Sequence, residues 1–417
     1  MCPESREKGV KVRRESAAVL SHEDHETAVI PTKSRLIDAL LDLWAQAPAD
    51  QVSVRSVVHK AGAAQSAIHY HFADLERLYA SASAAALAAA RDWFAAERAR
   101  LDPLAGAALP PAAQASILAG IIAAWTAAQR RLAMAWRHAP SGEWQAAWDD
   151  FWRDVAARLG LAAEADTLAC FAAGEASRHL LVWNPPLDRA LLEENTAALV
   201  MWLRERRMEP GSVRAAFRAL ASGGYDQPAP PSDAQADAIT DAAAALLAEA
   251  GHAGVTFRAV AARAGVTLGK VIHVHGTKSA LLHAALHRLY EREAVGDAAR
   301  QRLALQLPPE VMLAYLLEAV LGGRQPVLAA YDEIERAIYN GEEYRPLRGL
   351  IRSMDDPTGA WALRQMLGGV EPSATLVAAF SGVIRGIGYR AAHRGPDDRD
   401  LETGAQRALR PFSLREA

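Results

Sequence analysis

The fold is indicated by two stretches of the sequence: SVRSVVHKAGAAQSAIHYHFADLERLY at residues 53–79 and TFRAVAARAGVTLGKVIHVHGTKSALL at residues 256–282. Each begins with a hydroxyl residue, Ser53 or Thr256, directly before a run whose apolar residues have helical spacing. A serine or threonine oxygen at this place accepts a hydrogen bond from an N–H group of the first helical turn. Both stretches are therefore predicted to open with a helix.

Both predicted helices are short and end at a glycine, Gly62 in the first stretch and Gly265 in the second. Glycine takes the left-handed conformation that commonly ends a helix at little steric cost. A second short helix follows each glycine, over residues 64–72 and 267–275. A cap, a short helix, a glycine turn and a second short helix together predict a helix-turn-helix.

The two stretches are copies of one another, offset by 203 residues without a gap, so that Arg55 is matched by Arg258. An amphipathic helix precedes each copy, as LIDALLDLW at residues 36–44 and DAITDAAAALLAEAG at residues 237–251. A repeat of this length indicates the duplication of a whole domain, because solenoid repeats have much shorter periods.

The composition fits a folded helical protein of two or more domains. The chain has 417 residues, more than one hydrophobic core usually supports, with 51% apolar and 23% charged residues. Its two cysteines form neither a disulfide framework nor a zinc-ligand spacing. No apolar run reaches the roughly 18 residues of a membrane span, so we expect a cytoplasmic protein without a membrane partner; if its helix-turn-helix binds DNA, it is also nucleoid-associated. Because the net charge is −3, any affinity for DNA has to come from the placement of basic residues.

The residues of both stretches resemble the DNA-binding heads of the TetR family of bacterial regulators. The family pattern is a cap followed by x-R-x-[VI]-A-x-x-A-G-V-[ST]-x-G-x-[LI]-Y-x-H-F-x-x-K. The first copy departs from it at His69 and Leu75, which replace Tyr and Lys. The second copy departs at Ile272, Val274 and His275, which replace Tyr, His and Phe. The resemblance implies an all-α fold with two TetR-like units in tandem, each a helix-turn-helix head followed by a helical effector and dimerisation bundle.

This interpretation divides the chain into an arm, two heads, two bundles and a linker. The arm alternates charges without an apolar face, so its basic residues either contact phosphates or remain a solvated tail; they are Lys8, Lys11, Arg13 and Arg14. The linker is predicted from its glycine and proline content. The boundaries are 1–31 for the arm, 32–80 for head 1, 81–220 for bundle 1, 221–232 for the linker, 233–282 for head 2 and 283–417 for bundle 2.

The resemblance also implies that the second short helix of each head enters the major groove of a double-stranded DNA operator. Glutamine pairs with adenine and arginine with guanine, while serine and threonine chiefly bind phosphates. The candidate DNA-binding residues are Ser53, Arg55, Gln65, Ser66, His69, Tyr70 and His71 in head 1, and Thr256, Arg258, Thr267, Lys270, His273 and Lys278 in head 2. Leu268, Gly269 and Ile272 occupy further reading positions of head 2. Because the two heads differ at these positions, we expect a non-palindromic operator; the alternative is that head 2 is a degenerate packing unit.

The resemblance places a pair of dimerising helices at the end of each unit. We expect these helices at residues 165–183 and 187–207 in the first unit, and at 373–393 and 397–410 in the second. Gly382 and Gly386 lie four residues apart on one helix face, which close helix packing would justify. The two pairs are predicted to form a four-helix bundle within one chain, so that a monomer acts as an intramolecular pseudo-dimer.

Tryptophans recur at helical spacing in the first bundle, with acidic residues between them. Such a stripe would suit a small hydrophobic or aromatic effector, flat or cationic, through stacking and cation–π contacts. The alternative is that these rings simply fill the core. The candidate pocket residues are Trp125, Trp136, Trp144, Trp148 and Trp152, and the acidic residues are Glu143, Asp149, Asp150 and Asp154.

The leading hypothesis is a sequence-specific transcriptional regulator, a repressor released by its effector. The alternative is a helical protein that binds a ligand or a partner and has lost DNA affinity in one or both heads. We expect no enzymatic activity and no cofactor, because neither a nucleophile motif nor a nucleotide-binding glycine loop occurs. His283 and His287 have a spacing that can bind a metal, but no third ligand accompanies them, so no metal site is expected.

Overall fold

The computed structural model describes residues 31–46, 52–223, 234–292, 305–322, 357–391 and 399–413. Within these ranges the regular structure consists of helices, and none of the described residues forms a strand. The predicted all-α fold is confirmed. The basic residues of the arm, and Pro48 between the first two helices, lie outside the described residues.

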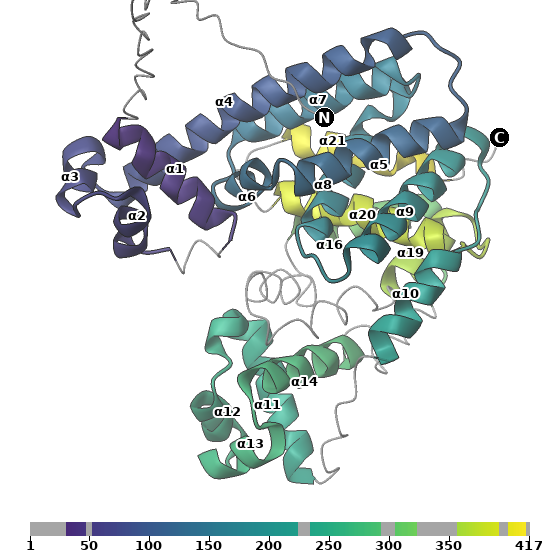
Figure 1. The fold of residues 1–417 in the computed structure, drawn as a ribbon. Helices are drawn as coiled ribbons and strands as arrows, with labels where there is room; N and C mark the ends of the chain where they lie inside the picture. Colours follow the sequence, from purple (N-terminus) through teal and green to yellow (C-terminus); the bar gives the residue numbers. More distant parts are fainter. Residues whose placement is uncertain are drawn as a thin grey trace, which may run out of the picture.

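The first head is a bundle of short helices beside the start of a long one (Figure 1, purple). Its interior is apolar because Leu36 and Trp44, Val57, and Ile68 are buried, one or two from each short helix. The helices are α1 (Thr32–Trp44), α2 (Val54–Ala61) and α3 (Ser66–Phe72), followed by α4 (Leu75–Leu101).

The second head repeats this arrangement with its own core (Figure 1, lower part). Ile239, Val260, Val271 and Leu281 are buried in it and supply one side chain from each helix. The helices are α11 (Ala234–Gly254), α12 (Phe257–Ala264), α13 (Leu268–His275) and α14 (Lys278–Tyr290).

The body of the first unit begins with the later turns of α4, the helix whose first turns pack in the head. It continues with α5 (Pro111–Ala127), α6 (Arg130–His138), α7 (Gly142–Arg158), α8 (Ala165–His179), α9 (Pro185–Glu205) and α10 (Ser212–Gly223). The expected linker at 221–232 overlaps the end of α10, so its first residues are helical. By length and apolarity no single described helix qualifies as a bilayer span, and α5 and α6 meet these criteria only as a pair bent by 75°.

The body of the second unit is described in part. It contains α16 (Pro309–Leu321), α19 (Pro357–Met366), α20 (Ala374–Ala391) and α21 (Arg399–Leu409). The predicted helix pairs of both units are present, as α8 with α9 and α20 with α21.

Helices α8 and α9 of the first unit pack against α20 of the second, and α21 also contacts α8 (Figure 1). The crossing of α8 and α20 is so close that glycine is required on both helices. A Cβ atom on Gly386 would overlap the carbonyl oxygen of Cys170, and one on Gly174 would overlap that of Gly382. The close helix approach predicted from Gly382 and Gly386 is therefore confirmed.

Polar contacts fix the register of this intramolecular bundle. Arg390 of α20 is buried and donates hydrogen bonds to Asp149 (2.6 Å) and to the Cys170 sulfur (3.1 Å). Thr167 donates to the carbonyl oxygen of Ala408 (2.9 Å) and Trp202 to that of Pro411 (3.0 Å). Sliding the helices past one another would separate Arg390 from Asp149 and leave a charge without compensation in the core, which is unfavourable. The ion pair therefore favours one register.

Candidate nucleic-acid interface

The turn of the first head is fixed by a reciprocal cap, of which the sequence predicted only one half. The Ser53 hydroxyl accepts a hydrogen bond from the Ser56 N–H (3.1 Å), and the Ser56 hydroxyl accepts one from the Ser53 N–H (2.9 Å). Gly62 ends α2 in the left-handed conformation with φ of 59°, as predicted. Cap and glycine together set the direction in which α3 leaves α2.

Helix α3 presents the predicted reading residues on one open face. Gln65, Ser66, His69 and Tyr70 are exposed, while Ile68 on the opposite face is buried. The Tyr70 ring is 85% exposed, which for a large aromatic side chain is typical of a binding surface. The structure thus brings four of the candidate base-reading residues together.

His71 and Arg55 flank this face. The His71 ring is half-buried and stands edge-on to the Tyr70 ring at 4.8 Å between centroids. Arg55 and Ser53 are exposed at the start of α2. Their positions agree with contacts to the phosphate backbone or to base edges beside α3.

One candidate reading residue, His69, also has a local structural role. Its Nδ1 lies 2.8 Å from the carbonyl oxygen of Ala73, so this nitrogen donates the hydrogen bond. Ala73 has φ of 67° and ψ of −48°, a strained backbone conformation for a residue with a side chain. His69 therefore stabilises the turn after α3.

The second head uses the same turn with an additional cap. Thr256 accepts a hydrogen bond from the Ala259 N–H (3.1 Å), and Gly265 ends α12 with φ of 67°, both as predicted. Thr267 accepts one from the Lys270 N–H (3.3 Å) and so caps α13. In the first head Gln65 precedes α3 without a side-chain cap, and α3 begins one position later than α13.

The open face of α13 is largely apolar. Leu268 and Ile272 are 42% and 45% exposed, and Gly269 and His273 are exposed beside them. Lys270 is half-exposed at the edge of this face. The second head therefore offers the aligned positions of the first head with few hydrogen-bonding groups.

Two histidines lie in the interior of the second head. His275 occupies the position of the buried Phe72, and no described residue makes a hydrogen bond with its Nε2. Burial lowers the pKa of His275, and burial together with His287 lowers the pKa of His283 to about 3. Both rings are therefore neutral at neutral pH.

Neither helix-turn-helix contains an acidic residue, a sequence signal that the inspection of basic residues alone had missed. Aspartate and glutamate are absent from residues 51–73 and from 250–290. The acids that flank this stretch are paired, Glu249 with Arg263 of α12 (2.5 Å) and Glu291 with His287 of α14 (3.3 Å). Although the chain has a net charge of −3, both helix-turn-helix segments are therefore free of negative side chains, which favours a surface that faces DNA.

Helix α6 connects the first head to the body. Arg131 donates to the Asp38 carboxylate of α1 (2.6 Å), and Arg130 donates to the carbonyl oxygen of Ala45 after α1 (3.3 Å). Arg130 also donates to the carbonyl oxygen of Leu180, at the end of α8 (2.7 Å). A displacement of α6 would therefore be transmitted to α1.

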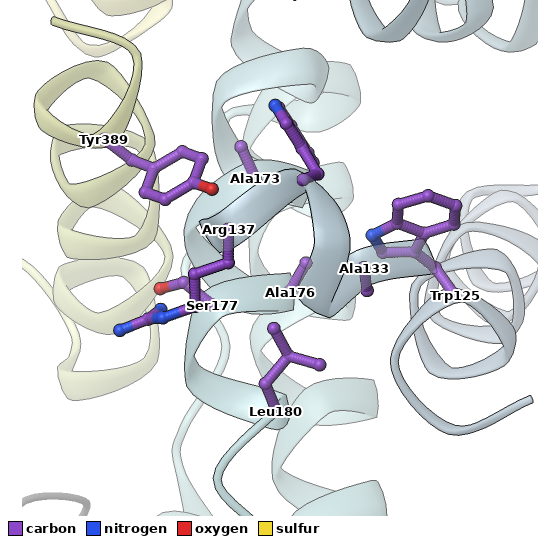
Figure 2. Close-up of a pocket in the computed structure, with 9 residues that line it drawn as sticks. Trp125, Ala133, Arg137, Ala173, Ala176, Ser177, Leu180 and Tyr389 are labelled. Carbon is purple, nitrogen blue, oxygen red and sulfur yellow. The ribbon is translucent and has the colours of Figure 1, made fainter. Parts of the chain in front are cut away.

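The five candidate pocket tryptophans gather in one aromatic cluster, and two of them line a cavity formed by described residues. Trp125 and Trp136 do so, together with Arg137, Leu180 and Tyr389 of the second unit, as Figure 2 shows for the labelled residues. The cavity has a volume of about 10 Å³, about the room that one water molecule needs.

The other three candidate tryptophans are core residues. Trp148 donates to the carbonyl oxygen of Ala169 (3.0 Å), and Trp144 donates to the Ser83 hydroxyl (3.1 Å). Trp152 is fully buried against Trp148, with 5.7 Å between ring centroids.

The acidic residues between these tryptophans are bound in ion pairs and do not line the cavity. Their partners are Arg91 for Glu143, Arg390 for Asp149, Arg153 for Asp150, and Arg98 with Arg158 for Asp154. The charged side chain that lines the cavity is Arg137. The expected carboxylates for a cationic ligand are thus absent from the residues that line this cavity.

His283 and His287 lie on one helix, α14, but in different surroundings. His283 is buried, whereas His287 is exposed and lies 3.3 Å from a carboxylate oxygen of Glu291. In the described part of the chain, no three His, Cys, Asp or Glu side chains are grouped so that they could hold a metal ion.

Two segments of the chain match one protein family model, described as bacterial regulatory proteins of the tetR family. The matches cover residues 36–82, from α1 into α4, and residues 239–285, from α11 into α14. No curated protein matches the chain.

Proposed function

We propose that the chain is a tandem TetR-family regulator, whose two heads match the family model, and that one polypeptide acts as a pseudo-dimer on one asymmetric operator. We further propose that it is a repressor whose affinity for DNA is lowered by a small effector.

The observation that carries the pseudo-dimer is the packing of α8 and α9 against α20. The bundle buries glycines of both units against backbone and joins Asp149 to Arg390. This pairing of helices from both units supports the proposal that one chain brings two heads together without a second chain. Linkage in one chain raises the effective concentration of the second head to about the millimolar range.

The asymmetric operator is supported by the open faces of the two reading helices. Head 1 offers Gln65, Ser66 and Tyr70 for hydrogen bonds, and head 2 offers Leu268 and Ile272 at aligned positions or beside them. Side chains of such different chemistry select different bases. Each head is therefore expected to bind its own half-site.

The effector site is proposed at the cavity between Trp125, Trp136 and Tyr389. A ligand larger than water would have to move these side chains and α6, which carries Arg137. The lining favours a flat apolar molecule with an acceptor or anionic group for Arg137, rather than a cation. Because Arg130 and Arg131 of α6 bind the backbone and side chains at α1, such a movement would shift head 1 and alter DNA affinity by about 1–3 kcal/mol.

The test is capture of genomic DNA fragments by the full chain, followed by footprinting of the captured sites. We expect salt-sensitive protection of two unlike half-sites, and Arg55→Ala or Gln65→Ala is expected to weaken protection of one of them by about 1–3 kcal/mol. Arg91→Ala on α4 is the matched control, since this exposed arginine pairs with Glu143 away from the reading face. Absence of sequence-specific binding by the native chain would contradict the regulator.

The same preparation separates the remaining alternatives. Light scattering is expected to give a monomer, and a stable dimer would mean four heads in each particle. If Arg258→Ala leaves every footprint unchanged, head 2 is a degenerate packing unit. If nothing binds DNA while a ligand shifts the unfolding temperature, the chain is a helical ligand-binding protein.

A further inference from the structure

The open face of α13 carries two large apolar side chains where α3 carries polar ones. We propose that head 2 reads its half-site mainly through the C5-methyl groups of thymine, contacted by Leu268 and Ile272. This inference rests on the proposed function, because it assumes that head 2 enters the major groove. Thymine is the one base of DNA that presents a methyl group there.

Leu268 and Ile272 form one continuous surface. They lie one helical turn apart, so their side chains are neighbours on the same side of α13. Both are nearly half-exposed, whereas the neighbouring Val271 of the same helix is fully buried. The core of the head therefore does not explain why these two residues are apolar.

Gly269 removes the side chain that would otherwise stand beside this pair. A Cβ atom there would meet nothing within 4 Å, so packing inside the protein does not require a glycine. The open position permits the backbone of α13 to approach an external partner closely, as a narrow fit between base edges requires.

The charges of head 2 favour DNA over a protein as the occupant of this apolar pair. Arg258 on α12, Lys270 on α13 and Lys278 at the start of α14 lie on the helices that make up this head. No acidic residue occurs between residues 250 and 290. An apolar strip on a head that carries cations and no acid in this stretch complements thymine methyl groups between two phosphate backbones.

The experiment replaces thymine by deoxyuridine, which lacks only the methyl group, in one half-site of the captured operator at a time. The head 2 half-site is the one whose protection Arg258→Ala weakens. There we expect about a fourfold loss of affinity for each methyl group that Leu268 or Ile272 contacts. The same replacement in the head 1 half-site is expected to change affinity less.

Protein variants locate the effect. Ile272→Ala is expected to weaken binding to thymine DNA and to reduce the loss caused by deoxyuridine, because the methyl contact is then already missing. Its matched control is His69→Ala in head 1, which should leave the deoxyuridine effect in the head 2 half-site unchanged. Ile272 is exposed, so the change is compatible with a folded head.

Three results would overturn the inference. Suppose that the chain binds the operator, but deoxyuridine in the head 2 half-site has no effect or no larger effect than in the head 1 half-site. Methyl reading by head 2 is then wrong, while the proposed regulator function is unaffected. If Ile272→Ala leaves DNA binding intact and instead disperses a dimer, the strip belongs to a second copy of the chain. If the native chain binds no specific DNA, the proposed function and this inference fail together.

Discussion

The two heads share the cap and the glycine turn of the helix-turn-helix but differ in the side chains that they expose. Both keep a hydroxyl cap, Ser53 or Thr256, and both turn at a left-handed glycine, Gly62 or Gly265. The open faces of α3 and α13 differ, by contrast: at aligned positions α3 has hydrogen-bonding side chains and α13 has apolar ones. The turn is thus constrained by local backbone chemistry, whereas the reading surface is free to change.

Each head also lacks a different stabilising feature. Head 1 lacks the cap that Thr267 gives α13 and has Ala73 at a positive φ where head 2 has Gly276. Head 2 has a buried histidine where head 1 has the aromatic ring of Phe72. Neither head is a uniformly weakened version of the other, which supports two working domains.

The most severe perturbation would separate the two units at the helix crossing. Gly386→Ala would place a Cβ atom against the backbone of α8, so we expect a loss of about 3 kcal/mol or more in the free energy of unfolding. Denaturant titration measures it. The matched control is Gly388→Ala, whose Cβ would lie an ordinary 3.5 Å from Val320. Equal stability of the two variants would contradict the close crossing.

The next effect in size concerns the buried histidine of head 2. His275→Phe is expected to stabilise this head by about 2 kcal/mol at neutral pH, since a buried nitrogen without a partner is removed. Hydrogen exchange of the α12 and α13 amides measures the change. Phe72→His in head 1 is the reverse test and should be destabilising.

The same residue predicts a pH dependence that differs between the heads. The folded pKa values of His275 and His283 lie below the ordinary value near 6.5. The unfolded state therefore binds more protons below that pH, and head 2 loses stability as pH falls from about 6.5 towards the folded values. His275→Phe should reduce this slope and leave the part due to His283. An unchanged slope in that variant would contradict the burial of the ring.

A smaller effect is expected at the start of the reading helices. Thr267→Ala removes the cap of α13 and should destabilise head 2 by about 1 kcal/mol, and Ala64→Thr at the aligned position of head 1 should stabilise it by a similar amount. Local hydrogen exchange again distinguishes the heads. If Ala64→Thr has no effect, α3 starts in a geometry that a threonine cannot cap.

The weakest effect is expected at the turn after the reading helices. Ala73→Gly relieves the positive φ and should stabilise head 1 by about 0.5–1 kcal/mol, whereas Gly276→Ala should destabilise head 2 by a similar amount. Thermal unfolding of the paired variants measures both. A combined Ala73→Gly and His69→Ala variant tests whether the His69 hydrogen bond still matters once the turn is relaxed.

Sequence reasoning succeeded wherever structure depends on neighbours in the chain. The caps at Ser53 and Thr256 and the turns at Gly62 and Gly265 follow from local hydrogen bonds and allowed φ angles, and all four are confirmed. The close packing at Gly386 was predictable because two glycines on one helix face lower the stability of the helix. Close packing of a neighbouring backbone, which only glycine permits, offsets that cost.

It did less well where a side chain depends on a distant partner. The spacing of Trp144, Trp148 and Trp152 suits a pocket and a core equally well, and only the packing of α7 against α8 shows that these three fill the core. The partner of Asp149 is Arg390, 241 residues away, which no local pattern indicates. The role of Ser56 was missed although it lies three residues from its partner, because the family pattern has no fixed residue there.

The contact between α8 and the helices of the second unit also affects how the protein is synthesised. Thr167 waits for a partner that lies 241 residues downstream, and Trp202 for one that lies 209 residues downstream. At a translation rate of about 5–20 residues per second, the apolar side of α8 stays uncovered for roughly 10–50 s. During that interval the uncovered surface can pair with the first unit of a second nascent chain on the same messenger RNA. We therefore expect ribosome-bound chaperones to bind this surface until the partner helices of the same chain have been synthesised.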